Sequence, residues 1–412
     1  TDTVSQGNAT LTGATFSITT LNEQPVWVNG KLYQKDEMCL TIITNENGLA
    51  STEEKALPVG HYRIEETQAP TGYLKDGAKT LEFEITKDGE MVDLTSKDTS
   101  IANQVIRGGV KVQKRDIETG ETKPQGNATL EGATFTITNL STHPVLVNEK
   151  LYESGQVVLT LKTDKSGAAV TAKDALPYGH YRIDETEAPN GYLNEGKLSQ
   201  EFDIQENGKI IDLTSKEHAI LNQIIRGDLE FVKVSDGDLN RLANVPFSIT
   251  SKTTGESHTI VTDKNGYAST SAEWNKHTAN TNRGETSEDG IWFGTSKPDD
   301  SKGALIYDTY ILEEQRCETN EGMNLLKIEV EVYRNHVVID MGTLTDDRIT
   351  IGTTALDKDT ESHLSKPEEK ITIIDTVEYE GLKKGQSYKL LGTLMDLSLI
   401  HISEPTRLRC IS

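Results

Sequence analysis

Three short segments of the chain each place one polar side chain in a row of apolar ones. Side chains alternate between the two faces of a strand, so residues two apart share a face. Lys114 ends the segment VKVQK, Glu185 ends the segment YRIDE, and Asn222 is the middle residue of ILNQI. A buried lysine or carboxylate is costly unless its pKa shifts or it finds a partner. We therefore expect these three side chains to form one buried cluster.

This combination of residue types can make a covalent bond. Burial lowers the pKa of a lysine and raises that of a glutamic acid. A neutral Lys114 amine is a nucleophile, and a protonated Glu185 can donate a proton and take one back. Attack on the Asn222 carboxamide would release ammonia and leave an isopeptide bond. Each module could carry out this reaction only once and only on itself. We therefore expect that the protein is not an enzyme that acts on other substrates.

The segment that contains this cluster is the second copy of an internal repeat. Residues 6–108 align without a gap with residues 125–227, at an offset of 119, and 57 of the 103 positions are identical. Solenoid units run about 20–50 residues, so a repeat of this length has the size of a whole domain. We expect a tandem array of independently folded modules.

The repeat predicts four modules and a tail. The first module (1–108) is expected to lack its first strand, whereas the second module (109–227) is complete. The third module (228–347) follows the repeat more weakly. The fourth module (348–396) begins a different, truncated unit, and residues 397–412 match nothing in the array, which indicates a non-native tail.

The modules have the pattern of strands rather than helices. Segments such as ATFTIT and VVLTLKT alternate apolar and polar residues and are rich in Val, Ile and Thr. Turn pairs such as Asn207-Gly208 separate them. No stretch has convincing helical periodicity. About seven short strands in a module predict an all-β chain of tandem immunoglobulin-like antiparallel β-sandwiches.

Two closely similar motifs give the modules a family resemblance. YRIEETQAPTGYL (62–74) and YRIDETEAPNGYL (181–193) resemble the E-box of Cna B-type, SpaA-like domains. The resemblance covers the first three modules and implies a prealbumin-like fold. Domains of this family build stalks and pilus shafts on Gram-positive bacteria and close isopeptide bonds. It implies that Lys114 is the nucleophile, Glu185 the catalytic acid/base and Asn222 the acceptor.

The first module retains only part of this trio. Glu66 and Asn103 occupy the positions equivalent to the glutamate and asparagine of the second module. The corresponding lysine would precede Thr1. We therefore expect that this module cannot crosslink.

The third module offers a variant of the trio. Lys233 and Glu314 fall at the expected places, although the E-box has diverged to YILEEQRCETNEGM. The family resemblance implies that aspartate can replace asparagine as the acceptor. Asp347 is the expected acceptor because it shares a face with Ile349 and Ile351, and Asp340 is a rival.

The fourth module resembles the repeat of VaFE-type surface-anchored proteins, in the stretch ITIIDTVEYEGLKKGQSYKLLGTLMD. That resemblance implies a Thr–Gln ester crosslink. Thr353, Thr354 and Thr376 are the candidate threonines. The glutamine would lie beyond the end of this module.

Composition excludes several classes of partner. The chain has 65 acidic and 42 basic residues and a net charge of −23, which disfavours binding to nucleic acid or anionic lipid. No apolar run approaches the roughly 18 residues of a membrane span. Three scattered cysteines exclude a disulfide framework. No spacing of ligand residues predicts a metal site, and we expect no cofactor.

These features predict a structural stalk or shaft segment of an adhesin or pilin, in the cell wall of a Gram-positive bacterium. Attachment to peptidoglycan would use a missing C-terminus. One alternative is the stalk of a cell-surface enzyme whose catalytic domain is missing. The other is an adhesin module that binds a host matrix protein or glycan.

A polar insertion at 271–303 in the third module is the expected place for any ligand binding. Trp274, Trp292 and Phe293 flank it. They would serve either as packing anchors for a long loop or as a contact surface for a ligand.

Overall fold

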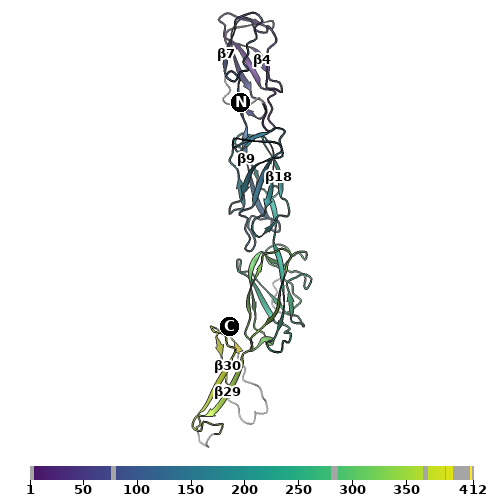
Figure 1. Cartoon of the computed structure of the whole chain (residues 1–412), viewed down its shortest axis with the longest axis vertical. Coiled ribbons are helices and arrows are strands. Elements are labelled where there is room, and N and C mark those ends of the chain that lie inside the picture. The colour runs from purple at the N-terminus through teal and green to yellow at the C-terminus, as the bar shows by residue number, and fades with distance from the viewer. Residues whose placement is uncertain are drawn as a thin grey trace. The chain divides into compact units, whose positions relative to one another are not determined.

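The computed structural model describes residues 4–75, 80–279, 286–364, 370–385, 387–392 and 409–410 (Figure 1). Within these residues the regular structure is almost entirely β-strand, and the one helix is a single 3-10 turn, η1 (Glu318–Asn320). The all-β prediction is confirmed. In the same part of the chain, no helix is long and apolar enough to cross a membrane.

Two compact units make up the chain. One contains residues 1–124 and 129–223, which are most of the first and second modules. The other contains residues 125–128 and 224–412, which include the third and fourth modules.

The first module contains one four-stranded sheet and two short ladders. The sheet has the order β4 (Met38–Ile43), β1 (Thr15–Thr20), β5 (Gly60–Gln68), β7 (Leu81–Ile85). The ladders are β2 (Val26–Val28) with β3 (Lys31–Tyr33), and β6 (Tyr73–Leu74) with β8 (Gln104–Val105). All these pairs are antiparallel.

The second module is a two-sheet sandwich. One sheet has the order β13 (Val157–Lys162), β10 (Thr134–Asn139), β16 (Gly179–Glu187), β18 (Ser199–Ile204). The other contains β14 (Ala168–Val170), β9 (Arg107–Asp116), β20 (Ile220–Ile224), β17 (Tyr192–Leu193), β15 (Leu176–Pro177) and β19 (Ile210–Leu213). A hairpin joins β11 (Val145–Val147) to β12 (Lys150–Tyr152).

The third module repeats this arrangement. One sheet has the order β23 (Ser257–Val261), β22 (Pro246–Ser251), β26 (Asp308–Glu314), β27 (Lys327–Val332). The other contains β24 (Tyr267–Ser269), β21 (Arg226–Val234), β25 (Leu305–Ile306) and β28 (Val338–Thr345). The fourth module pairs β29 (Thr350–Asp357) with β30 (Ile373–Glu380). A further ladder pairs β31 (Tyr388–Lys389) with β32 (Arg409–Cys410), and the rest of the predicted tail lies outside the described residues.

Strand alternation explains how each core fills. In β16, buried residues alternate with partly exposed ones over seven positions, as expected for a strand with one face on the core. Burying an aromatic or aliphatic side chain of this kind stabilises the fold by about 1.5–3 kcal/mol. The second module buries these side chains among others: Val110, Val112, Phe135, Ile137, Tyr181, Ile183, Phe202 and Ile220.

One buried tyrosine recurs in the first three modules and fixes the strand that carries the catalytic glutamate candidate. Tyr62, Tyr181 and Tyr310 are fully buried. Each hydroxyl donates to the carbonyl four residues earlier, at 2.8–2.9 Å. A buried tyrosine hydroxyl needs such a partner, so this bond sets where the strand begins in each module.

Within the first compact unit, a loop of the first module packs on the second module. Gly7 N donates to Pro144 O at 3.1 Å, and Asn8 N donates to Tyr178 O at 3.3 Å. The backbone of Gly7 has a φ of +61°, and a Cβ there would lie 2.0 Å from Tyr178 O. Glycine is therefore required both for conformation and for space. In the second compact unit Gly126 lies against the carbonyl of Tyr307 in the same way.

Replacing Gly7 with alanine is expected to open this contact without unfolding either module. The added methyl would overlap Tyr178 O, so the bonds made by the amides of residues 7 and 8 should break. Hydrogen exchange of the peptides covering 6–9 and 141–146 should accelerate, while the core strands keep their protection. Gly13→Ala is the matched control, since Gly13 also has a positive φ, +92°, but a Cβ added there would have no neighbouring atom within 4 Å. Equal exchange in both variants would contradict the prediction.

Candidate crosslinking sites

The fold of the second module brings the predicted trio together. Lys114 lies on β9, Glu185 on β16 and Asn222 on β20, and all three are buried. Lys114 Nζ lies 2.9 Å from Glu185 Oε2. Asn222 Nδ2 donates to the same oxygen at 2.8 Å and to Leu193 O at 2.9 Å. The carboxylate thus lies between the amine and the carboxamide.

Strand pairing explains this meeting. The first and last strands of the module, β9 and β20, pair in parallel, with Ile220 opposite Lys114. Alternation then points Lys114 and Asn222 to the same interior. Glu185 comes from β16 in the other sheet, with its neighbour Ile183 in the core. The three side chains therefore meet only because the two sheets pack face to face with these strands opposite one another.

Electrostatics poise the site for proton transfer. Burial lowers the pKa of Lys114 to about 8, although the nearby Glu185 carboxylate opposes the shift. Burial also raises the pKa of Glu185, with the lysine opposing it. Among the described residues, Glu185 Oε1 and Asn222 Oδ1 have no hydrogen-bond partner. The amide carbonyl is thus buried and unpaired beside an amine whose neutral form is accessible near physiological pH.

The first module contains two members of the trio. Glu66 is buried, and Asn103 Nδ2 donates to its Oε2 at 2.6 Å and to Leu74 O at 3.0 Å. Among the described residues, no lysine forms an ion pair with Glu66. The arrangement of Asn103 reproduces that of Asn222, so the interior keeps its geometry without the nucleophile.

Glutamine in place of Glu66 is expected to stabilise the first module at neutral pH. Burial raises the pKa of Glu66 above its usual 4.5, while Asn103 opposes the shift. The folded module therefore holds this proton more tightly than the unfolded chain. Its stability falls as pH rises from 4.5 to the raised pKa, and stays lower above it.

Calorimetry of Glu66→Gln against the wild type tests this sign. The variant should unfold at a higher temperature at about pH 7 and at a similar temperature at about pH 4. Glu65→Gln is the control, since Glu65 is the exposed neighbour on the same strand. A variant less stable than the wild type at neutral pH would refute the prediction.

The third module places a different aspartate from the expected one beside its buried lysine. Lys233 Nζ lies 2.8 Å from Asp346 Oδ2, and both side chains are fully buried. Glu314 is buried beside them. Burial and the facing Asp346 carboxylate raise the pKa of Glu314 to about 7. Two carboxyl groups that face each other repel when both are ionised, which is one cause of the raised pKa of Glu314.

The structure places Asp346, and not Asp347, against Lys233. Asp347 is exposed, and its carboxylate lies 3.6 Å from Lys383 Nζ. Asp340 is also exposed and accepts from Gly342 N at 2.8 Å. The alternation of buried and exposed side chains can be followed only along one strand. β28 ends at Thr345, and Asp346 is buried like Leu344, two residues before it, so it continues the alternation of β28. Counting backward from Ile351, which lies on β29, enters the break between the two strands before it reaches Asp347.

The aromatic residues at the insertion are mostly packing anchors. Trp292 and Phe293 are buried. The guanidinium of Arg226 lies 3.7 Å from the centre of the Trp292 ring. Phe293 packs edge-on against Tyr310, with ring centres 5.0 Å apart. Of the two roles expected for the aromatics at the insertion, packing is the one that the structure supports for Trp292 and Phe293.

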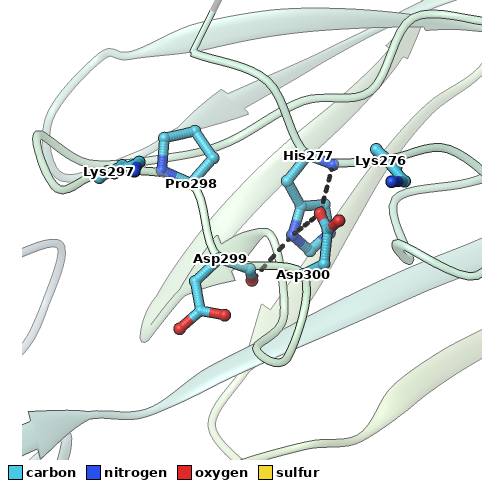
Figure 2. A pocket seen from close by; sticks show the side chains of 6 residues that line it. All are labelled: Lys276, His277, Lys297, Pro298, Asp299 and Asp300. Atoms are coloured by element: carbon cyan, nitrogen blue, oxygen red, sulfur yellow. Dashed lines mark hydrogen bonds and ion pairs between the residues drawn. The ribbon is translucent and has the colours of Figure 1, made fainter.

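A shallow hollow in this insertion is lined by Lys276, His277, Lys297, Pro298, Asp299 and Asp300 (Figure 2). The backbone N–H of His277 donates to the Asp300 carboxylate at 3.0 Å. The ring Nδ1 of His277 lies 3.2 Å from Asp299 O. Within the lining, His277 is thus bound to both Asp299 and Asp300. Among the described residues, no group of three or more His, Cys, Asp or Glu residues could hold a metal ion.

The candidate threonines of the fourth module lie on one hairpin. Thr354 pairs with Thr376, and Thr353 pairs with Val377, between β29 and β30. All three threonines are exposed.

Comparison with known families identifies the class of domain. A family model described as "SpaA: Prealbumin-like fold domain" matches residues 1–100 and 108–218, which is more than half of the chain. The chain belongs to this SpaA family. A second model, "T-Q ester bond containing domain", matches residues 349–405. This match covers the predicted fourth module and continues into the predicted tail.

Several solved structures resemble this SpaA-family chain. "The Bacillus anthracis TIE protein" is 25% identical over 82% of this chain and 48% of its own length, with a TM-score of 0.48. A streptococcal ancillary pilin is 18% identical, with 82% and 92% of the two chains covered and a TM-score of 0.23. The Bacillus cereus major pilin subunit BcpA is 15% identical, with 82% and 95% covered and a TM-score of 0.27. The chain therefore spans about half the length of the TIE protein, and no curated protein matches it.

Proposed function

We propose that this chain is a shaft or stalk segment of a cell-wall-anchored adhesin or pilin of a Gram-positive bacterium, and that its modules crosslink themselves. The buried meeting of Lys114, Glu185 and Asn222 carries the proposal. A nucleophile, a proton carrier and an amide carbonyl in one dry interior are the components of amide exchange. Membership of the SpaA family and the T-Q ester match support a structural role at the cell surface.

In the second module the reaction is an exchange of amines on one carbonyl carbon. The Lys114 amine attacks Cγ of Asn222, a C–N bond to lysine forms, and the C–N bond to the amide nitrogen breaks. Glu185 protonates the amide nitrogen as it leaves and takes the extra proton from lysine. The products are an amide and ammonia, and Glu185 ends in the state in which it began.

In the third module the same attack has a carboxyl group as its acceptor. Lys233 and Asp346 would condense to an amide, with loss of one carboxyl oxygen as water. The two protons in that water come from the lysine ammonium. Glu314 would carry the proton between them. Here Asp346 takes the role that we expected for Asp347.

A bond between Lys114 and Asn222 would join the first and last strands of the second module. Tension on the chain ends would then pass through covalent bonds rather than the hydrogen bonds between β9 and β20. Such a bond does not depend on redox conditions, unlike a disulfide. That suits a chain with three scattered cysteines.

Mass spectrometry of the full chain tests the proposal. Peptide mapping should find a Lys114–Asn222 linkage with loss of about 17 Da and a Lys233–Asp346 linkage with loss of about 18 Da, the masses of the ammonia and water released. Glu185→Ala should abolish the first linkage and leave the second. Unshifted masses at both sites would overturn the proposal. Attachment to peptidoglycan and contact with a host matrix protein or glycan remain predictions.

A further inference from the structure

The glutamate of the third module has a hydrogen-bond donor that its counterpart lacks. In the second module, Glu185 accepts from Lys114 and from the acceptor residue Asn222 itself. An aspartate acceptor has no N–H group to offer. In the third module, Asn320 Nδ2 donates to Glu314 Oε1 at 2.9 Å.

The orientation of Asn320 is fixed on every side. Its side chain is fully buried on the turn η1. Oδ1 accepts from Cys317 N at 2.9 Å, and Nδ2 also donates to Gln315 O at 2.9 Å. With the oxygen held by a donor, the nitrogen must face Glu314. The backbone N–H of Leu326 donates to the other carboxyl oxygen of Glu314 at 3.2 Å.

We propose that Asn320 is a positioning residue of the third-module crosslink, which supplies Glu314 with the amide N–H that an asparagine acceptor would provide. This inference rests on the proposed function. The N–H fixes the plane of the Glu314 carboxyl and favours its ionised form. Glu314 can then take a proton from Lys233 as well as deliver one to the leaving oxygen of Asp346.

Two charged side chains, Lys233 and Asp346, act on Glu314, and Arg316 follows it two residues along the chain. Lys233 lies on β21, Asp346 follows β28, and Arg316 donates to the backbone carbonyls of Asn320 and Met323. Burial and Asp346 raise the pKa of Glu314, while Lys233 and Asn320 lower it. A carboxyl that exchanges protons works best with a pKa near the working pH. Without the Asn320 donor, the pKa of Glu314 would rise further, and Glu314 would be ionised, and so able to accept a proton, in a smaller fraction of molecules.

The variant Asn320→Asp distinguishes a role in positioning Glu314 from a role in holding the turn η1 in place. A carboxylate oxygen still accepts from Cys317 N, but the donor to Glu314 is lost. The full chain is made by cell-free translation, moved to buffers at about pH 7 and about pH 5, and sampled by peptide mapping. We expect the third-module linkage to form about tenfold more slowly than in the wild type at the higher pH. At the lower pH a protonated aspartic acid can donate, so the rate relative to wild type should recover.

The second module provides an internal control in the same molecules. Its Lys114–Asn222 linkage should form at the wild-type rate in the Asn320→Asp chain. A purely structural role predicts slowing that does not depend on pH, and that result overturns the proposal, as does a wild-type rate at about pH 7. If the wild-type third module never links while the second does, the proposed third-module bond fails as well. Thermal unfolding of Lys233→Arg with and without Asn320→Asp measures any effect on folding separately.

Discussion

Replacing Glu185 with glutamine is expected to leave the second module unlinked and to lower its free energy of unfolding by roughly 4–5 kcal/mol. Glutamine has the shape of glutamate but cannot shuttle a proton. The proposed bond would close a loop of about 108 residues between Lys114 and Asn222, and in the chain-entropy model the absence of a crosslink over a loop of that size accounts for the expected loss. Chemical denaturation of the variant and the wild type measures the difference.

Two variants control for this prediction. Lys114→Met removes the nucleophile, so it should be unlinked and destabilised to a similar extent as Glu185→Gln. Glu187→Gln changes an exposed residue two positions along the same strand and should keep both the linkage and the stability. If Glu185→Gln still showed the mass loss of the linkage, Glu185 would not be the proton carrier.

The sequence predicted the second-module site because its three residues each lie inside a regular strand. Lys114, Glu185 and Asn222 all keep the alternation of their buried neighbours, so the two-residue period placed each of them in the interior. The internal repeat then assigned Glu66 and Asn103 by alignment alone. The same period also predicted the all-β fold, which the strand content confirms.

The third-module site shows where that reasoning ends. Asp346 lies one residue beyond β28, so its orientation depends on where the strand stops. Counting in steps of two residues from Leu344, inside β28, would have predicted that Asp346 is buried. The count that predicted Asp347 began on β29 instead. Asn320 was not predictable in this way, because it lies on a 3-10 turn in the most diverged part of the E-box. Tertiary contacts, and no local period, bring it to Glu314.

The sequence predicted the insertion at 271–303 but not its anchor, Arg226, for a related reason. Arg226 belongs to the repeated motif Ile-Arg-Gly, and its counterpart Arg107 is only partly buried. Arg107 begins β9 and donates to carbonyls of the second module, including Asp174 O at 2.8 Å and Leu146 O at 2.8 Å. In the third module the insertion covers this position, and the same residue type becomes its anchor. Sequence alone cannot show which loop folds over a repeated arginine.

Replacing Arg226 with methionine is therefore expected to destabilise the third module by roughly 3–5 kcal/mol. The side chain is 1% exposed, and it donates to Phe293 O at 3.0 Å and to Ala304 O at 3.2 Å. Methionine would fill much of the space but remove these side-chain donors, so that Ala304 O would keep the bond from Phe293 N and Phe293 O would lose the bond from the guanidinium. It would also remove the cation from the face of Trp292.

Tryptophan fluorescence during thermal unfolding measures this effect, since Trp292 lies beside the substituted residue. Arg334→Met is the matched control: it removes the same charge from an exposed position in the same module and should change the transition little. Arg226→Lys keeps the charge but loses the planar fork that reaches several carbonyls at once, so it should fall between the two. Equal midpoints for Arg226→Met and Arg334→Met would show that the insertion is held by its apolar residues alone. An intermediate Arg226→Lys would instead assign the anchoring to the geometry of the guanidinium as well as to its charge.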